Sequence, residues 1–150
     1  MRFLLVDRIL ECPQSGPIRG CKNVAMSEDV LEHHFPGNPI MPGALLLEAI
    51  VQLAGWQVAV RSDFAEWLLL SRVKRCAFYG FVRPGDRVSL EVEPQGDEAP
   101  GLCAFRGTGS VDGARKIAVE LVGELVPLAE LVDPSDARRM LAILGGGGSF

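Results

Sequence analysis

The chain has 150 residues, 48% of them hydrophobic, and carries a formal net charge of −4. This length is enough for one domain with a sizeable buried core. The acidic balance argues against a general nucleic-acid-binding role, because such binding needs a basic excess to meet the phosphates. We therefore expect a soluble globular protein.

The first strand is expected over Phe3–Glu11, where aliphatic residues are frequent and Pro13 follows. A second strand is expected over Ile18–Ser27. Residues 28–42 are predicted to form a loop, because three prolines disfavour helix in the residues that precede them. The N-terminus reaches Asp7 too soon for the apolar core of a signal peptide, which favours a cytoplasmic protein.

A helix is expected from Gly43 or Ala44 to about Arg61, and it is apolar on every side. Glu48 and Gln52 interrupt the apolar run, which is shorter than the roughly 20 residues that usually span a membrane. We therefore predict a helix buried in protein and no membrane association.

Four further strands are expected after this helix. They cover residues 67–82, 88–92, 102–111 and 116–126, with a loop at 95–101. The dipeptide Asp112-Gly113 is the strongest hairpin signal in the chain. A short amphipathic helix is expected over residues 133–144, capped by Asp133 or Ser135, followed by a flexible tail at 145–149.

These elements predict an α+β fold in which a curved antiparallel sheet wraps around one long central helix. A helix that is apolar on every face needs cover on every face, and a second subunit could supply what the sheet leaves open. The architecture therefore predicts a dimer. We expect the folded domain to cover residues 1–132, with the C-terminal helix and Gly-rich tail at 133–150.

Two residues in this region can carry chemistry. His34 lies on the proline-rich loop, and Glu48 lies fourteen residues later in an apolar segment where a carboxylate is costly unless it has a task. An imidazole beside a desolvated carboxyl is suited to general acid–base chemistry. Taken alone, His34 is better explained as a loop histidine that bonds to backbone.

The loop and helix resemble the β-hydroxyacyl-acyl-carrier-protein dehydratases, which have the hot-dog fold. The matching residues are His34-Phe35-Pro36-Gly37-Asn38-Pro39-Ile40-Met41-Pro42-Gly43, then Leu45-Leu46-Leu47-Glu48-Ala49 and Gln52. The resemblance extends over roughly residues 3–127. His33 departs from the glycine that is usual before the family's histidine. Residues 78–84 look more like the sister form with Asp on the helix, so the subfamily stays open.

The resemblance implies a role for each of these residues. His34 would remove the C2 proton of a 3-hydroxyacyl thioester, and Glu48 would protonate the departing hydroxyl. The backbone N–H of Gly43, at the start of the helix, would stabilise the thioester oxyanion. Gln52 lies one turn after Glu48 and could hold its carboxyl, although structural support alone would explain it as well. Phe35, Phe78, Phe81 and Trp56 are expected as walls of an acyl tunnel, or simply as core.

Partners and cofactors follow from the same resemblance. The substrate would arrive on the phosphopantetheine arm of an acyl carrier protein, and a homodimer with shared active sites, or a higher oligomer, is implied. A basic rim that attracts the acidic carrier is expected from Arg72 and Lys74, with Arg75, Arg83 and Arg87 nearby in sequence, although a solvated strand face explains these charges equally well. No motif for a metal or a redox cofactor is present in the sequence, and we expect none.

Cys12, Cys21, Cys76 and Cys103 show no metal-site or redox-pair spacing, so we expect four free thiols, each packed as a small hydrophobe.

Three functions compete. Dehydration of a (3R)-3-hydroxyacyl thioester to the trans-2-enoyl thioester leads. Thioester hydrolysis is the second reading, because other hot-dog proteins direct water at the thioester with a helix carboxylate. A non-catalytic acyl-binding partner subunit is the third. Retention of both His34 and Glu48 favours dehydration.

Overall fold

A computed structural model describes residues 3–147 as one six-stranded antiparallel sheet with two α-helices. The elements in chain order are β1 (Arg8–Glu11), β2 (Ile18–Asn23), α1 (Gly43–Arg61), β3 (Glu66–Phe78), β4 (Arg87–Ala99), β5 (Leu102–Val111), β6 (Ala114–Pro127) and α2 (Pro134–Leu144). Two short 3₁₀ helices, η1 (Asp29–Glu32) and η2 (Leu128–Glu130), complete the list. The strand order is β1-β2-β4-β5-β6-β3.

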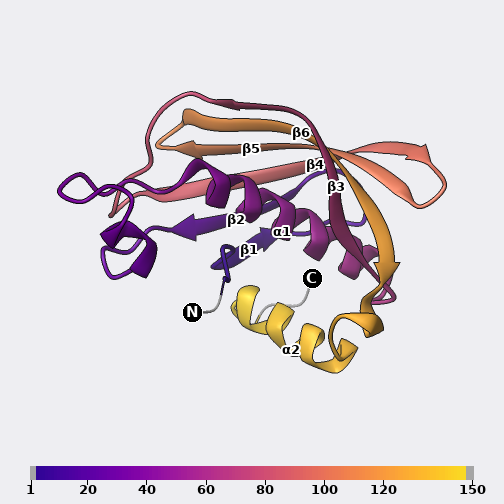
Figure 1. Ribbon diagram of the computed structural model, residues 1–150. Coiled ribbons are helices and arrows are strands. Elements are labelled where there is room, and N and C mark those ends of the chain that lie inside the picture. The colour runs from indigo at the N-terminus through magenta and orange to yellow at the C-terminus, as the bar shows by residue number, and fades with distance from the viewer. Residues whose placement is uncertain (1–2, 148–150) are drawn as a thin grey trace.

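The sheet arches over α1, and α2 lies on the side of α1 away from β5 (Figure 1). This is the α+β arrangement predicted from the sequence, with the bounds of α1 as expected. The helix is long and apolar enough to cross a membrane by length and composition. In the fold, however, it forms the centre of the core: Ile50, Leu53 and Ala54 are fully buried.

Glycines on the inner face of the sheet allow α1 to lie close to it. Gly107 on β5 faces Ile50 so closely that a Cβ atom there would overlap the Ile50 side chain. On the helix itself, Gly55 leaves room for Trp67 of β3, whose ring also meets Trp56 edge to face at 5.2 Å. Trp56 is therefore part of the core.

Local sequence signals set both the hairpin and the C-terminal helix. Asp112 and Gly113 have φ values of 48° and 78°, as a two-residue type I′ turn requires, and they join β5 to β6 as predicted. The Asp133 carboxylate caps α2 by accepting a hydrogen bond from the Ser135 N–H at 2.7 Å. Residues 148–149 of the predicted flexible tail lie outside the described residues.

Several predicted bounds are wrong, each for a tertiary reason. The first strand is limited to Arg8–Glu11, because Phe3 and Leu5 bond to the Gln52 side chain instead of a neighbouring strand. The second strand ends at Asn23, and η1 interrupts the predicted loop. The third strand ends at Phe78, after which Met41 N–H bonds to the Val82 carbonyl.

The predicted loop at 95–101 is also wrong, because most of it extends β4. Residues up to Ala99 pair with β5, with irregular register around Gly96 and Asp97. The polar residues are tolerated in this strand because both of its faces are exposed there.

We predict that Gly107→Ala lowers the free energy of unfolding by about 1–3 kcal/mol, since the added methyl group forces Ile50 away from its packed position. Urea unfolding at fixed protein concentration measures this. Gly80→Ala is the matched control: its Cβ would lie 3.5 Å from Lys116 Nζ, so a change of about 0.5 kcal/mol or less is expected. Equal losses in both variants would contradict the close packing of α1 on β5.

Candidate active site

His34 is held by its own loop so that one ring nitrogen stays free. Its Nδ1 lies 3.0 Å from the Ile40 carbonyl oxygen, and the ring stacks on Phe35 with centroids 4.5 Å apart. The Ile40 N–H in turn donates to the His34 carbonyl at 2.9 Å. Because a carbonyl only accepts, Nδ1 must carry the hydrogen. In the neutral ring, Nε2 then presents a lone pair and can act as a base.

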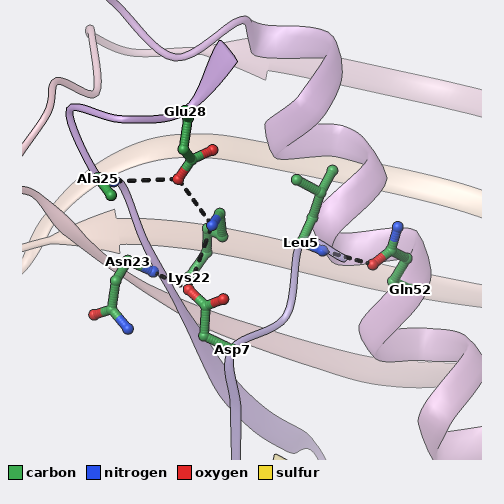
Figure 2. A network of polar contacts seen from close by, with 7 residues as sticks. All are labelled: Leu5, Asp7, Lys22, Asn23, Ala25, Glu28 and Gln52. Carbon is green, nitrogen blue, oxygen red and sulfur yellow. Dashed lines mark hydrogen bonds and ion pairs between the residues drawn. The ribbon is translucent and has the colours of Figure 1, made fainter. Parts of the chain in front are cut away.

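Glu48 lies in the second turn of α1, half-buried, and Gln52 holds its carboxylate. The Gln52 amide donates to Glu48 Oε1 at 2.9 Å and to the Phe3 carbonyl at 2.9 Å. Its Oε1 accepts from the Leu5 N–H at 2.9 Å, as Figure 2 shows. One side chain therefore fixes the N-terminal segment (residues 3–7) against the helix and orients the carboxylate.

Gly43 is the first residue of α1, where the N–H groups have no acceptor within the helix. The ring of Phe78 lies directly on it: a Cβ at Gly43 would come 2.7 Å from Phe78 Cε1. Any side chain at position 43 would therefore displace the ring. Phe35 and Phe78 are each 54% exposed, so both present open aromatic surface beside His34 and the helix N-terminus. Phe81 is exposed as well.

The structure thus brings together three pairs of the residues singled out from the sequence: His34 with Phe35, Gly43 with Phe78, and Glu48 with Gln52. Within one chain, no hydrogen bond joins His34 to Glu48 among the described residues. The acid–base pair is therefore not joined by a direct hydrogen bond inside a single subunit.

Arg72 and Lys74, the two residues expected on a basic rim, both pair with Glu98 of β4, so one carboxylate offsets part of their positive charge. Sequence reasoning missed a different basic feature. Arg75, Arg106 and Arg115 line a cavity of about 410 Å³ on the outer face of the sheet, here called the arginine cavity. These three arginines are far apart in sequence, and only the pairing register of the strands could have indicated that they lie together.

A buried lysine was also missed. Lys22 of β2 is 6% exposed and lies near the carboxylates of Asp7 and Glu28 (Figure 2). The available signal was the alternation along β2, which places Lys22 on the same face as the buried Ile18 and Gly20.

The cysteines give no sign of an activated thiolate. All four are free; Cys12 and Cys21 are buried as predicted, whereas Cys76 and Cys103 are only half-buried. Burial raises the pKa of the Cys12 and Cys76 thiols. Burial together with the nearby Asp97 raises the pKa of Cys103 to about 11. Within residues 3–147, no group of three metal-binding side chains gathers.

Comparisons with known proteins agree with this architecture. The family model described as FabA-like domain matches residues 1–120. A 3-hydroxyacyl-[acyl-carrier-protein] dehydratase FabZ from Symbiobacterium thermophilum is 37% identical over 140 residues, covering 91% of this chain and 94% of that protein. Another from Thermoanaerobacter sp. (strain X514) is 46% identical over 91 residues, 60% of this chain and 64% of that protein. The chain thus matches less than two thirds of that relative's length.

Among solved structures, a hot-dog-like protein from Thermanaerovibrio acidaminovorans has a TM-score of 0.64 at 18% identity. It covers 89% of this chain and 94% of its own. This similarity shows the hot-dog fold, the predicted class, and nothing about chemistry.

We predict that neutral His34 is the Nδ1–H tautomer, because its Nδ1 faces an acceptor that cannot donate. Nitrogen-15 NMR of the imidazole rings distinguishes the two tautomers. His33 is exposed and provides the internal control in the same spectrum. A His34 ring protonated on Nε2 when neutral would contradict its assignment as a base.

Proposed function

We propose that this chain, which belongs to the FabA-like domain family, converts a (3R)-3-hydroxyacyl-[acyl-carrier-protein] thioester to the trans-2-enoyl thioester in fatty-acid or polyketide-type synthesis. The observation that carries the proposal is that one chain holds both a base with a free Nε2, His34, and a half-buried carboxyl, Glu48, which is held by Gln52. The curated relatives reported above bear the name of this activity.

The proposed reaction needs a base, an acid and an oxyanion site. His34 Nε2 takes the proton from C2, and the electron pair of that bond passes toward the thioester carbonyl. The N–H groups at the start of α1, with Gly43 first, stabilise the negative charge on the thioester oxygen. Collapse of the enolate expels the C3 hydroxyl, which takes a proton from Glu48 and leaves as water. No metal or redox step is required.

We further propose a homodimer in which His34 of one subunit works with Glu48 of the other. Among the described residues of one chain no hydrogen bond joins His34 to Glu48, and a second copy would complete the pair. The edge strand β3 supports such a dimer. It is 13 residues long and exposes Leu69, Leu70 and Val73. A long apolar edge strand is a site for pairing with another chain.

The proposed partner is an acyl carrier protein, which docks at the arginine cavity. Three arginines line this cavity and Glu120 is its only acid, so the surface is locally basic although the chain is acidic. Tyr79, stacked near Arg115 with 6.0 Å between Cζ and the ring centroid, follows Phe78 at the helix N-terminus. A carrier held there lies close to Phe78 and to Gly43, the proposed oxyanion site. We propose a cytoplasmic location for this reaction.

Incubation with 3-hydroxyacyl thioesters of several chain lengths tests the function. Enoyl product and free thiol are followed together. Enoyl product without thiol is expected for dehydration, because the thioester bond stays intact. Thiol without enoyl product would identify a thioesterase, and neither product would identify a binding module.

In the same assay, His34→Ala and Glu48→Ala should each remove nearly all dehydration while leaving a folded protein. If the pair acts as a unit, the double variant should be little worse than either single one. Mixing the two single variants, with subunit exchange verified by mass, should restore part of the activity because one intact pair reforms. No recovery after verified exchange would contradict shared sites.

Arg106→Ala and Arg115→Ala together should raise KM for a carrier-bound substrate by roughly tenfold, since steering of the acidic partner is lost. The same acyl group on pantetheine alone should be turned over unchanged. Arg72→Ala is the control, because its guanidinium is already paired with Glu98. If the original protein, the double variant and Arg72→Ala had equal KM values for the carrier-bound substrate, docking at the arginine cavity would be contradicted.

A further inference from the structure

A buried cation lies between two segments that position the proposed catalytic residues (Figure 2). Lys22 Nζ is 3.4 Å from Asp7 Oδ2 and 3.0 Å from Glu28 Oε1. Asp7 ends the N-terminal segment, and Glu28 begins the stretch that leads to His34. A buried ammonium is costly unless it is paired, so the position of Lys22 depends on both carboxylates.

One arm of this bridge leads to Glu48. Two residues before Asp7, the Leu5 N–H donates to Gln52 Oε1 at 2.9 Å. The amide nitrogen of Gln52 donates to Glu48 Oε1, also at 2.9 Å. A shift of the N-terminal segment therefore changes the orientation of Gln52, and with it the carboxylate that Gln52 holds.

The other arm leads to His34. Glu28 Oε1 also accepts from the Ala25 N–H at 3.1 Å, which fixes the turn after β2. The Leu31 N–H then donates to the Glu28 carbonyl at 2.9 Å and begins η1. His34 follows two residues after η1 ends. A shift of Glu28 therefore moves the base of the loop that carries the imidazole.

We propose that Lys22 is a positioning residue for the catalytic pair, and that its ammonium ties the segment behind Glu48 to the loop of His34. This inference rests on the proposed dehydration. Without the ammonium, the two carboxylates repel each other across a largely buried space, and both arms move. Since His34 and Glu48 of one chain serve different sites in the proposed dimer, Lys22 would also connect the two sites.

Lys22→Met tests the bridge, because methionine keeps most of the length of the side chain and removes its charge. Arg19→Met is the matched control. Arg19 lies on the same strand and also pairs with two carboxylates, Glu11 and Glu91, both at 2.6 Å. Neither of these two leads to His34 or Glu48. A second variant, Glu28→Ala, removes one of the two ion pairs of Lys22. Because the Glu28 side chain is partly exposed, this variant serves as the test if Lys22→Met fails to fold.

We expect kcat of folded Lys22→Met and Glu28→Ala to fall by about tenfold or more, because small displacements of reacting groups are costly. KM should stay within about twofold of the original protein, since no substrate contact is removed. Arg19→Met should keep the original kcat. The proposal would be overturned if folded Lys22→Met had the same kcat as Arg19→Met. If Lys22→Met does not fold, the kcat of Glu28→Ala decides in the same way.

Amide hydrogen exchange separates this inference from the proposed function, because it needs no substrate. In Lys22→Met, exchange should be faster both at Leu5 and at Leu31, and in Arg19→Met at neither. Unchanged exchange at both amides would overturn the bridge even in an active enzyme. An original protein without dehydratase activity would refute the proposed function, while the exchange pattern would still decide whether Lys22 joins the two segments.

Discussion

The rest of the structure depends on burying α1, a helix that is apolar on every face yet carries a carboxylate. The sheet covers one side, with Gly107 and Gly55 removing the side chains that would keep helix and strands apart. The N-terminal segment covers another side through Gln52. Covering the helix and orienting Glu48 are thus achieved by the same contacts, which places the candidate acid at the border of the core.

Two polar side chains, Gln52 and Lys22, fix the positions of the segments that pack around α1. Gln52 satisfies two backbone groups of the N-terminal segment and one carboxylate oxygen. Lys22 neutralises two carboxylates from separate segments. An unpaired polar group in such surroundings costs far more than a pair gains, so each of these networks favours one arrangement strongly. Because leaving these hydrogen bonds and ion pairs unmade would be costly, the site is held in one arrangement.

Local charge on this protein follows strand register rather than composition. Glu120 of β6 lies opposite Arg75 of β3 on one side and Arg106 of β5 on the other. One acid is therefore shared by two bases, and the arginine cavity stays basic in a chain of net charge −4. Glu98 likewise reaches both Arg72 and Lys74, so its single charge offsets only one of the two. In both places, the strand register decides which carboxylate lies near the basic side chains.

Short-range chemistry written in the sequence determined α1, the Asp112-Gly113 hairpin, the cap of α2 and the pairing of Glu48 with Gln52. Each depends on residues at most a few positions apart. The residues of the proposed acid–base pair were found through the resemblance of the proline-rich loop and the helix to a known family, because His34 taken alone does not indicate catalysis. Tertiary structure alone decided that Phe3 and Leu5 bond to Gln52 instead of a neighbouring strand, that β4 extends to Ala99, and that Lys22 bridges Asp7 and Glu28. Those outcomes depend on hydrogen-bond partners distant in the chain, and no local propensity specifies which distant partner a backbone or charged group will meet.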